Sequence, residues 1–388
     1  MASCDASETC LTKKSTRRRR PIPFSIPVLA NIEALTTGWL SAALETEVLD
    51  FSASQIVGEG YASRMYRLNL RYEAIEHHPS TLILKLVTDN LQMSELLEDD
   101  ALFREVFFYQ NLADHVADVL PKIYYSGSDA SSRQLTLLME DLGDIPHKKF
   151  SESLPNSISA MQILARCHAA FWNAEILSSP SLTPLDSVVD ADAVETLFKA
   201  NIEIEMVADY RYPYLRKSVK NVAKVVKWIL GEADLFSGPI TLMHGDFHAR
   251  NIYFTSDRVM VFDWQQAERG SPARDVIYWL VTSVEPRNFL EFQPLLIDAY
   301  LKALDDNGVD YSRKSFMKDF SDTAAQLIPR IYCFQSLIEW SDEDRHELLD
   351  FLTNADSLAR QIHLLALARL ARIFAPVAVT VLRWFGKR

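Results

Sequence analysis

Two acidic residues and one asparagine, spaced five and twelve residues apart, form the part of the sequence best suited to chemistry. Asp246 and Asn251 lie within residues 244–252, and Asp263 follows the apolar run 259–262. Phosphoryl transfer needs a carboxylate that orients a hydroxyl, and an amide oxygen and a second carboxylate that hold Mg²⁺ on ATP phosphates. The pattern therefore predicts that Asp246 is the catalytic carboxylate and that Asn251 and Asp263 bind the metal.

Three neighbouring basic residues have less certain roles, which the sequence leaves open. His244 fits a scaffold role, with its ring hydrogen-bonded inside the loop, better than that of a general base. His248 could approach the transferring phosphate as a cation, pack against the acceptor, or hold the loop. Arg250 could add positive charge, but the sequence favours an exposed and solvated side chain.

A lysine stands inside an apolar strand candidate in the N-terminal third of the chain. Lys85 lies within residues 81–87, where an unpaired charge would be costly, so it needs an acidic partner. Glu105 fits best because it belongs to a helical segment with a strong apolar face, although Glu95 and Glu98 are alternatives. We predict a Lys85–Glu105 pair whose ammonium faces nucleotide phosphates. The competing interpretation is an edge strand that directs Lys85 into water.

Two glycines precede this lysine in a turn between strand candidates. Gly58 and Gly60 lack the third glycine of a complete phosphate-binding fingerprint, and Ser63 occupies its place. The turn lies one strand pair before Lys85, which favours a loop that covers phosphates. Backbone N–H groups and the Ser63 hydroxyl would then be the hydrogen-bond donors.

The character of the sequence changes near residue 141. Before it, an amphipathic helix at 35–44 is followed by strand candidates and an acidic helix at 95–112, and the strand candidates lie at 56–68, 65–72, 81–87, 123–125 and 134–139. After it, helical patterns such as 157–174 dominate, interrupted by the hairpin that carries Asp246. We predict an α+β, bilobal fold with a β-rich N-lobe (31–141), a mainly helical C-lobe (142–388) and a ligand site between them.

Net charge and cysteine content indicate which partners the protein binds and in which compartment it lies. A net charge of −12 argues against general nucleic-acid binding, which requires basic surfaces. Four cysteines show neither metal-ligand spacing nor a disulfide framework, which indicates a reducing compartment and predicts a cytoplasmic protein. We predict no transmembrane segment, and the oligomeric state is left open.

The two ends of the chain differ from the rest. Residues 1–30 contain basic residues at 13, 14 and 17–20 followed by prolines, which predicts a disordered tail, with a targeting signal as the alternative. Residues 373–385 are apolar but shorter than the roughly 20 residues that span a bilayer. A helix packed on the core is the favoured interpretation there, and interfacial membrane contact is the alternative.

Taken together, these motifs resemble the aminoglycoside phosphotransferase and choline kinase superfamily, and within it the ecdysteroid-kinase-like branch. The resemblance covers residues 35–340 and rests on Gly58-x-Gly60, Lys85, Glu105 and the segments 138–142, 164–172, 244–251, 262–265 and 270–275. It implies a protein-kinase-like fold that uses ATP and Mg²⁺ to phosphorylate a hydroxyl of a small molecule.

The resemblance also implies roles for individual residues. Asp246 would be the catalytic base, with Asn251 and Asp263 as metal ligands. Lys85, paired with Glu105, would contact the α- and β-phosphates, and the adenine would bind the backbone near Glu140 and Leu142. Asp275 would brace the catalytic loop without taking part in the chemistry.

Departures from the protein-kinase pattern bear on the acceptor. Asp263 is followed by Trp and Gln rather than Phe and Gly, and Gly245 stands where protein kinases usually carry Arg. Only residues 265–273 separate Asp263 from the next helix, which leaves little platform for a peptide. A small-molecule acceptor is favoured, with an atypical protein kinase and a non-catalytic pseudokinase as alternatives. Residues 186–214 are rich in acidic and aromatic residues, but they do not discriminate among a steroid, an antibiotic, an amino alcohol, a sugar or another secondary metabolite as the acceptor.

Overall fold

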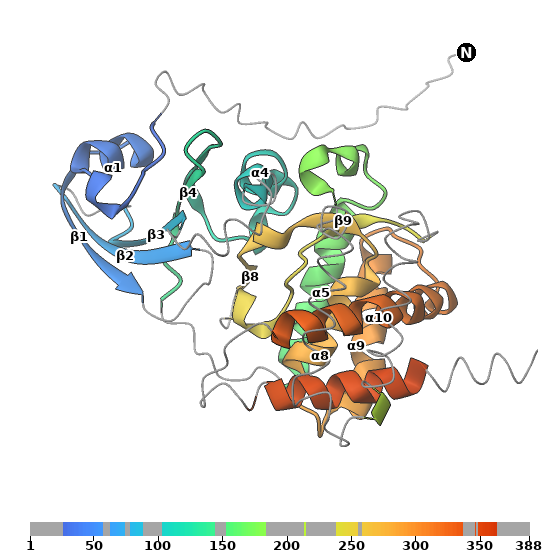
Figure 1. Ribbon diagram of the computed structural model, residues 1–388. Coiled ribbons are helices and arrows are strands. Elements are labelled where there is room, and N and C mark those ends of the chain that lie inside the picture. Colours follow the sequence, from blue (N-terminus) through green and yellow to red (C-terminus); the bar gives the residue numbers. More distant parts are fainter. Residues whose placement is uncertain are drawn as a thin grey trace, which may run out of the picture.

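The structure, a computed structural model, describes residues 26–56, 63–73, 78–87, 103–143, 153–183, 213–214, 238–254, 258–336, 346 and 348–362. These residues form a smaller lobe around one antiparallel sheet and a larger, mainly helical lobe (Figure 1). This is the bilobal α+β fold that the sequence predicts. Gly58, Gly60, the basic residues 13–20, most of the stretch 186–214 and the apolar segment 373–385 lie outside the described residues.

The sheet of the smaller lobe has the strand order β1-β2-β3-β5-β4. Its strands are β1 (Val48–Ile56), β2 (Ser63–Tyr72), β3 (Thr81–Val87), β4 (Ile123–Asp129) and β5 (Gln134–Glu140). Strand β3 is central, and its register sets Lys85 opposite Met65 of β2 and Leu137 of β5. The alternative of an edge strand for Lys85 is therefore wrong, because both sides of β3 are paired.

Alternation along β3 sends its side chains to two different cores. Leu82 and Leu84 pack with Trp39 and Leu40 of helix α1 (Thr37–Leu44), whose N-cap is Thr36. Ile83 points to the opposite core, which continues into the larger lobe. Helix α4 (Arg104–Asn111) lies between the sheet and the larger lobe (Figure 1). Lys85, two residues after Ile83, faces this helix.

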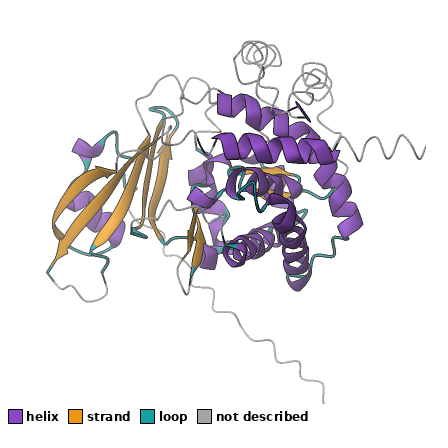
Figure 2. Ribbon diagram, turned by 90° about the horizontal axis from the view of Figure 1, so that it is seen from below, coloured by secondary structure: helices purple, strands orange, loops and turns teal. Residues whose placement is uncertain are grey.

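Long helices make up most of the described part of the larger lobe, where helix predominates in Figure 2. They are α5 (Leu154–Ala170), α8 (Ala273–Ser283), α9 (Phe289–Asp306) and α10 (Arg313–Ser336). The helix predicted at 157–174 ends earlier, at Ala170, because Phe171 leaves helical geometry and Asn173 adopts a left-handed φ of 51°. Shorter 3₁₀ turns are Ile32–Ala34, Ala113–His115, Ala117–Val119, Glu175–Ser178, Pro180–Leu182, Ala249–Asn251 and Trp264–Gln266.

A helical segment at residues 348–362 packs against the end of α8. The side-chain amide of Asn354, which is fully buried, donates to the carbonyl of Val284 at 2.6 Å and lies 3.5 and 3.4 Å from those of Leu280 and Val281. Carbonyls at a helix end have no partner within the helix. Asn354 therefore satisfies the end of α8 from a distant part of the chain.

Two small ribbons hold the segment that carries Asp246. Strands β7 (Ile252–Phe254) and β8 (Val259–Val261) form the predicted hairpin. Strand β6 (Thr241–Met243) pairs with β9 (Glu268–Gly270), which the sequence did not predict. Within the described ranges, no helix combines the length and apolar character needed to cross a bilayer.

Candidate active site

Lys85 joins the smaller lobe to the segment after β8. Its ammonium lies 2.6 Å from a carboxylate oxygen of Glu105 on α4 and 2.7 Å from one of Asp263. Lys85 and Glu105 are both buried, with exposed fractions of 5% and 1%. Burial alone would lower the pKa of Lys85, but the carboxylates of Asp263 and Glu105 outweigh it and raise that pKa. Lys85 is therefore a fixed cation, with Glu105 and Asp263 as its partners among the described residues, and the alternatives Glu95 and Glu98 lie outside those residues.

Asp246 receives hydrogen bonds from three directions. Its carboxylate lies 3.2 Å from the amide nitrogen of Asn251 and 3.4 Å from Nε2 of His248, and it accepts from the hydroxyl of Tyr278. Burial alone would raise the pKa of Asp246, but His248 and Tyr278 hold it well below its usual range. The carboxylate is thus ionised at neutral pH and fixed in one orientation. Tyr278, on α8, was missed by sequence reasoning, and only its helical spacing from Asp275 could have suggested it.

Asn251 connects Asp246 with Phe262, the residue directly before Asp263. The side-chain nitrogen of Asn251 donates to the backbone carbonyl of Asp246 at 2.9 Å, and the backbone carbonyl of Asn251 accepts from the N–H of Phe262 at 3.1 Å. Asp263 follows directly and has a left-handed φ of 65°, a conformation that is uncommon outside glycine. The structure therefore brings the two predicted metal ligands and the predicted catalytic carboxylate into one hydrogen-bonded segment.

The donor set of Asn251 and Asp263 fits Mg²⁺, which prefers oxygen ligands. The amide nitrogen of Asn251 faces Asp246, so its oxygen is left for a cation, and the Asp263 side chain is 26% exposed. Among the described residues, no group of three or more His, Cys, Asp and Glu side chains could hold a metal alone. An ion at this site would need further oxygens, such as those of nucleotide phosphates.

Asp275 braces the segment between β6 and Asp246. It is fully buried, and its carboxylate accepts from the N–H groups of His244 at 2.7 Å and Gly245 at 3.0 Å. His168 of α5 lies 3.2 Å from the same carboxylate and is itself bonded to Tyr300. The position of Asp275 agrees with the bracing role that the resemblance implies.

Both ring nitrogens of His244 are used within the loop. Nδ1 accepts from the N–H of Asp246 at 3.3 Å, and Nε2 donates to the carbonyl of Phe262 at 3.0 Å. Burial lowers the pKa of His244, so the ring is neutral. This geometry supports a scaffold role and leaves no nitrogen for general base catalysis. His248 accepts from the N–H of Arg250 and contacts Asp246, while Arg250 is exposed.

Gly245 has no room for a side chain. Its φ is +82°, and an added Cβ would lie 2.3 Å from the carbonyl oxygen of Gln266. We therefore expect Gly245→Ala to lower the free energy of unfolding by about 3 kcal/mol or more, through backbone strain and overpacking.

The matched control for this change is Gly308→Ala. Gly308 has a similar φ of +84° but nothing within 4 Å of the added carbon, so it reports the conformational penalty alone. That penalty is about 1–2 kcal/mol. Urea unfolding of both variants measures the difference, and equal losses would contradict a steric role for Gln266.

The segment that joins the lobes contains the predicted adenine-binding residues. The N–H of Glu140 donates to the Lys122 carbonyl, and the Glu140 carboxylate pairs with Arg258 at 3.0 Å. Within the part of the chain described, the N–H of Leu142 has no hydrogen-bond partner. Ser63 begins β2. The covering loop with Gly58 and Gly60 stays a prediction.

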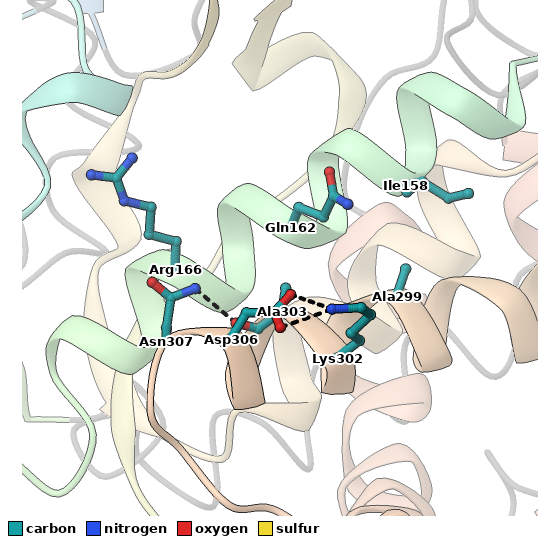
Figure 3. A pocket seen from close by; sticks show the side chains of 8 residues that line it. All are labelled: Ile158, Gln162, Arg166, Ala299, Lys302, Ala303, Asp306 and Asn307. Atoms are coloured by element: carbon teal, nitrogen blue, oxygen red, sulfur yellow. Dashed lines mark hydrogen bonds and ion pairs between the residues drawn. The ribbon is translucent and has the colours of Figure 1, made fainter.

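A surface hollow of about 490 Å³ lies elsewhere, between α5 and α9 (Figure 3). The two basic residues that line it are both in ion pairs, Lys302 with Asp306 at 2.6 Å and Arg166 with Asp118. Arg166 and His168 are two residues apart on α5, which places them on opposite sides of the helix. The hollow is therefore separate from the cluster around Asp246.

Comparison with known families decides the classification. The model of the ecdysteroid kinase-like family matches residues 57–310. The chain belongs to this family. The match includes Lys85, Glu105, Asp246, Asn251 and Asp263. No curated protein sequence matches the chain.

Solved structures show which fold this ecdysteroid kinase-like protein shares. Choline kinase from Cryptosporidium parvum Iowa II is similar, with 11% identity, a TM-score of 0.51, and coverage of 84% of this chain and 92% of that chain. Amicoumacin kinase hAmiN, in complex with AMP-PNP, Ca²⁺ and Ami, has 13% identity, a TM-score of 0.51 and coverage of 82% and 92%. Spectinomycin phosphotransferase APH(9)-Ia, in complex with ADP and spectinomycin, has 11% identity, a TM-score of 0.51 and coverage of 84% and 97%. At these identities the likeness concerns the fold.

Proposed function

We propose that this protein is an ATP- and Mg²⁺-dependent phosphotransferase that phosphorylates a hydroxyl group of a small molecule. One observation carries the proposal: Lys85 pairs with Asp263, the preceding residue Phe262 is hydrogen-bonded to Asn251, and Asn251 is hydrogen-bonded to Asp246. These contacts bring together a fixed cation, side-chain oxygens that would bind a metal, and an ionised carboxylate. Membership of the ecdysteroid kinase-like family, and similar folds that hold AMP-PNP or ADP, support the same activity.

Nucleotide binding is assigned to both lobes. The Lys85 ammonium would contact the α- and β-phosphates, and Glu105 would keep it in place. Leu142 would offer its N–H to the adenine, and the loop with Gly58, Gly60 and Ser63 would cover the phosphates. Bound Mg²⁺, held by Asn251 and Asp263, would neutralise phosphate charge.

Asp246 would act on the acceptor. Because its carboxylate is ionised, it accepts a hydrogen bond from the hydroxyl and points the oxygen at the γ-phosphorus. A carboxylate with a lowered pKa is a weak base, so it takes the proton late, when the new P–O bond has made the oxygen acidic. Its main contribution is therefore orientation.

A short segment after Asp263 favours a small acceptor over a peptide. The 3₁₀ turn Trp264–Gln266 leads directly into β9, which pairs with β6 beneath the site. Helix α8 begins three residues after β9. This leaves no long segment on which a peptide could lie, and it supports small-molecule specificity.

Transfer of labelled phosphate tests the proposed function and identifies the acceptor. The protein is incubated with γ-labelled ATP, Mg²⁺ and a fractionated metabolite extract, and the labelled product is identified by mass. A proteome fraction runs in parallel. We expect label in one or a few small molecules. Label in proteins alone, or in neither fraction, would overturn the proposal.

Lys85→Met should disable transfer. Methionine fills a similar volume but cannot contact phosphates, so kcat/KM should fall about a hundredfold or more. The matched control is Lys302→Met, which removes an exposed lysine paired with Asp306 and should leave kcat/KM unchanged. Steady-state kinetics with the identified acceptor measures both. Retained activity in Lys85→Met would exclude the proposed phosphate contact.

A further inference from the structure

Helix α4 carries two adjacent buried charges that point to different parts of the molecule. Glu105, at 1% exposure, meets Lys85 of the sheet. Arg104, at 2% exposure, is its immediate neighbour. Consecutive residues of a helix are about 100° apart, so they reach different partners. The proposed function uses Glu105 but gives no role to Arg104.

All described partners of Arg104 belong to the larger lobe. Its guanidinium donates to the carbonyl of Ala267 at 3.2 Å and to that of Thr183, and it lies 3.5 Å from the Glu268 carboxylate. Ala267 and Glu268 follow Asp263 closely in the chain. A planar guanidinium with several donors holds such a set in one geometry, which a flexible ammonium cannot do.

Glu268 extends this contact toward the catalytic segment. It is fully buried at the start of β9, where it pairs with Met243, the residue directly before His244. Its second carboxylate oxygen pairs with Arg274, the neighbour of Asp275 on α8. One buried carboxylate thus connects α4 with both elements that brace the Asp246 loop.

An apolar contact supports the same docking. Phe108 of α4 stacks on Trp264, with ring centroids 4.0 Å apart and an interplanar angle of 5°. Parallel rings can slide past each other at little cost, so this stack alone does not fix the helix. The directional bonds of Arg104 do, because their donors and acceptors must stay aligned.

We propose that Arg104 is a positioning residue: its bonds to Thr183, Ala267 and Glu268 hold α4 where Glu105 meets Lys85. This inference rests on the proposed nucleotide-binding function. The orientation of α4 is then set by side chains of the protein itself. Between Trp264 and Pro272 the chain has one hydroxyl, Ser271, which is buried and bonded to Thr323. The position of α4 therefore does not depend on a covalent modification of a hydroxyl group in residues 264–272.

Two ligands distinguish positioning from general stability. Wild type and Arg104→Met are titrated with AMP-PNP plus Mg²⁺ and, separately, with adenosine. Lys85 would contact phosphates only, so adenosine reports the rest of the site. We expect Arg104→Met to weaken AMP-PNP binding about tenfold and adenosine binding less than about twofold. Equal weakening of both ligands, or no weakening of AMP-PNP binding, would overturn the inference.

Arg269→Met is the matched control. Arg269 lies on the same strand as Glu268 but donates to the carbonyl of Leu177 rather than to α4. It should leave both affinities unchanged. If Arg104→Met does not fold by circular dichroism, Arg104→Lys takes its place, since lysine keeps the charge but not the fork. The lysine variant should show the same selective loss for AMP-PNP.

A second background tests whether Arg104 acts through Lys85. In Lys85→Met, adding Arg104→Met should change AMP-PNP affinity less than about twofold, because the affected contact is already absent. A tenfold additional loss would mean that Arg104 acts by another route. Failure of wild type to bind AMP-PNP would refute the proposed function itself, whereas binding that is insensitive to Arg104 would refute this inference alone.

Discussion

Asp246→Asn is expected to lower kcat for the identified acceptor by about a thousandfold or more. Asparagine is nearly isosteric, but it is neutral, so it is a poor acceptor for the substrate hydroxyl and cannot take its proton. Asn251 and His248 both face the same carboxylate oxygen of Asp246, so the amide oxygen of asparagine can accept from both in the same place. The loss is therefore chemical rather than structural. Steady-state kinetics measures kcat.

The affinity for nucleotide distinguishes a loss of catalysis in Asp246→Asn from a loss of folded structure. The affinity for AMP-PNP with Mg²⁺ should stay within about threefold of wild type, because Lys85, Asn251 and Asp263 are retained. Asp322→Asn, at an exposed position paired with Lys318, serves as the control and should keep full turnover. Turnover close to wild type in Asp246→Asn would remove Asp246 from the catalytic role.

Asp275→Ala should have the largest effect on stability. The carboxylate is fully buried and accepts from the N–H groups of His244 and Gly245 and from His168. Its removal leaves these donors buried without an acceptor. We expect a loss of about 3–5 kcal/mol in the free energy of unfolding. Urea denaturation followed by tryptophan fluorescence measures it.

Two variants calibrate that result. Asp275→Asn keeps one acceptor oxygen and should be destabilised less than the alanine variant. Asp298→Ala, at an exposed residue paired with Arg313, should change stability by less than about 0.5 kcal/mol. If Asp275→Ala matched Asp298→Ala, the brace on the Asp246 loop would be energetically unimportant.

Local rules explain what the sequence could predict. A lysine in an apolar strand requires an acidic partner, and the strong apolar face around Glu105 favoured this residue over Glu95 and Glu98. The alternation of polar and apolar residues at 65–72 and the short apolar run at 81–87 identified strands, and the hairpin after Asn251 followed from two short apolar runs. These features depend on residues near one another in the chain. The roles of Asp246, Asn251 and Asp263 stay predictions until they are tested.

Long-range geometry accounts for what was missed. Strands β6 and β9 are three residues each, too short to produce a periodic signal. Arg104 and Glu268 are 164 positions apart in the chain, so no local sequence pattern around either residue predicts their contact. Tyr278 looks like an ordinary apolar residue of an amphipathic helix. Its role depends on the loop after β6, which brings Asp246 to α8.

The amide of Asn354 has a consequence for the size of the independently folding unit. The segment shared by the ecdysteroid kinase-like family ends at residue 310, yet the side chain that completes the end of α8 comes from residue 354. Helix α8 carries Asp275 and Tyr278. A protein shortened to the shared segment would leave the last carbonyls of this helix unsatisfied inside an apolar environment. In this chain, the smallest stable domain therefore extends well past the region by which its family is defined.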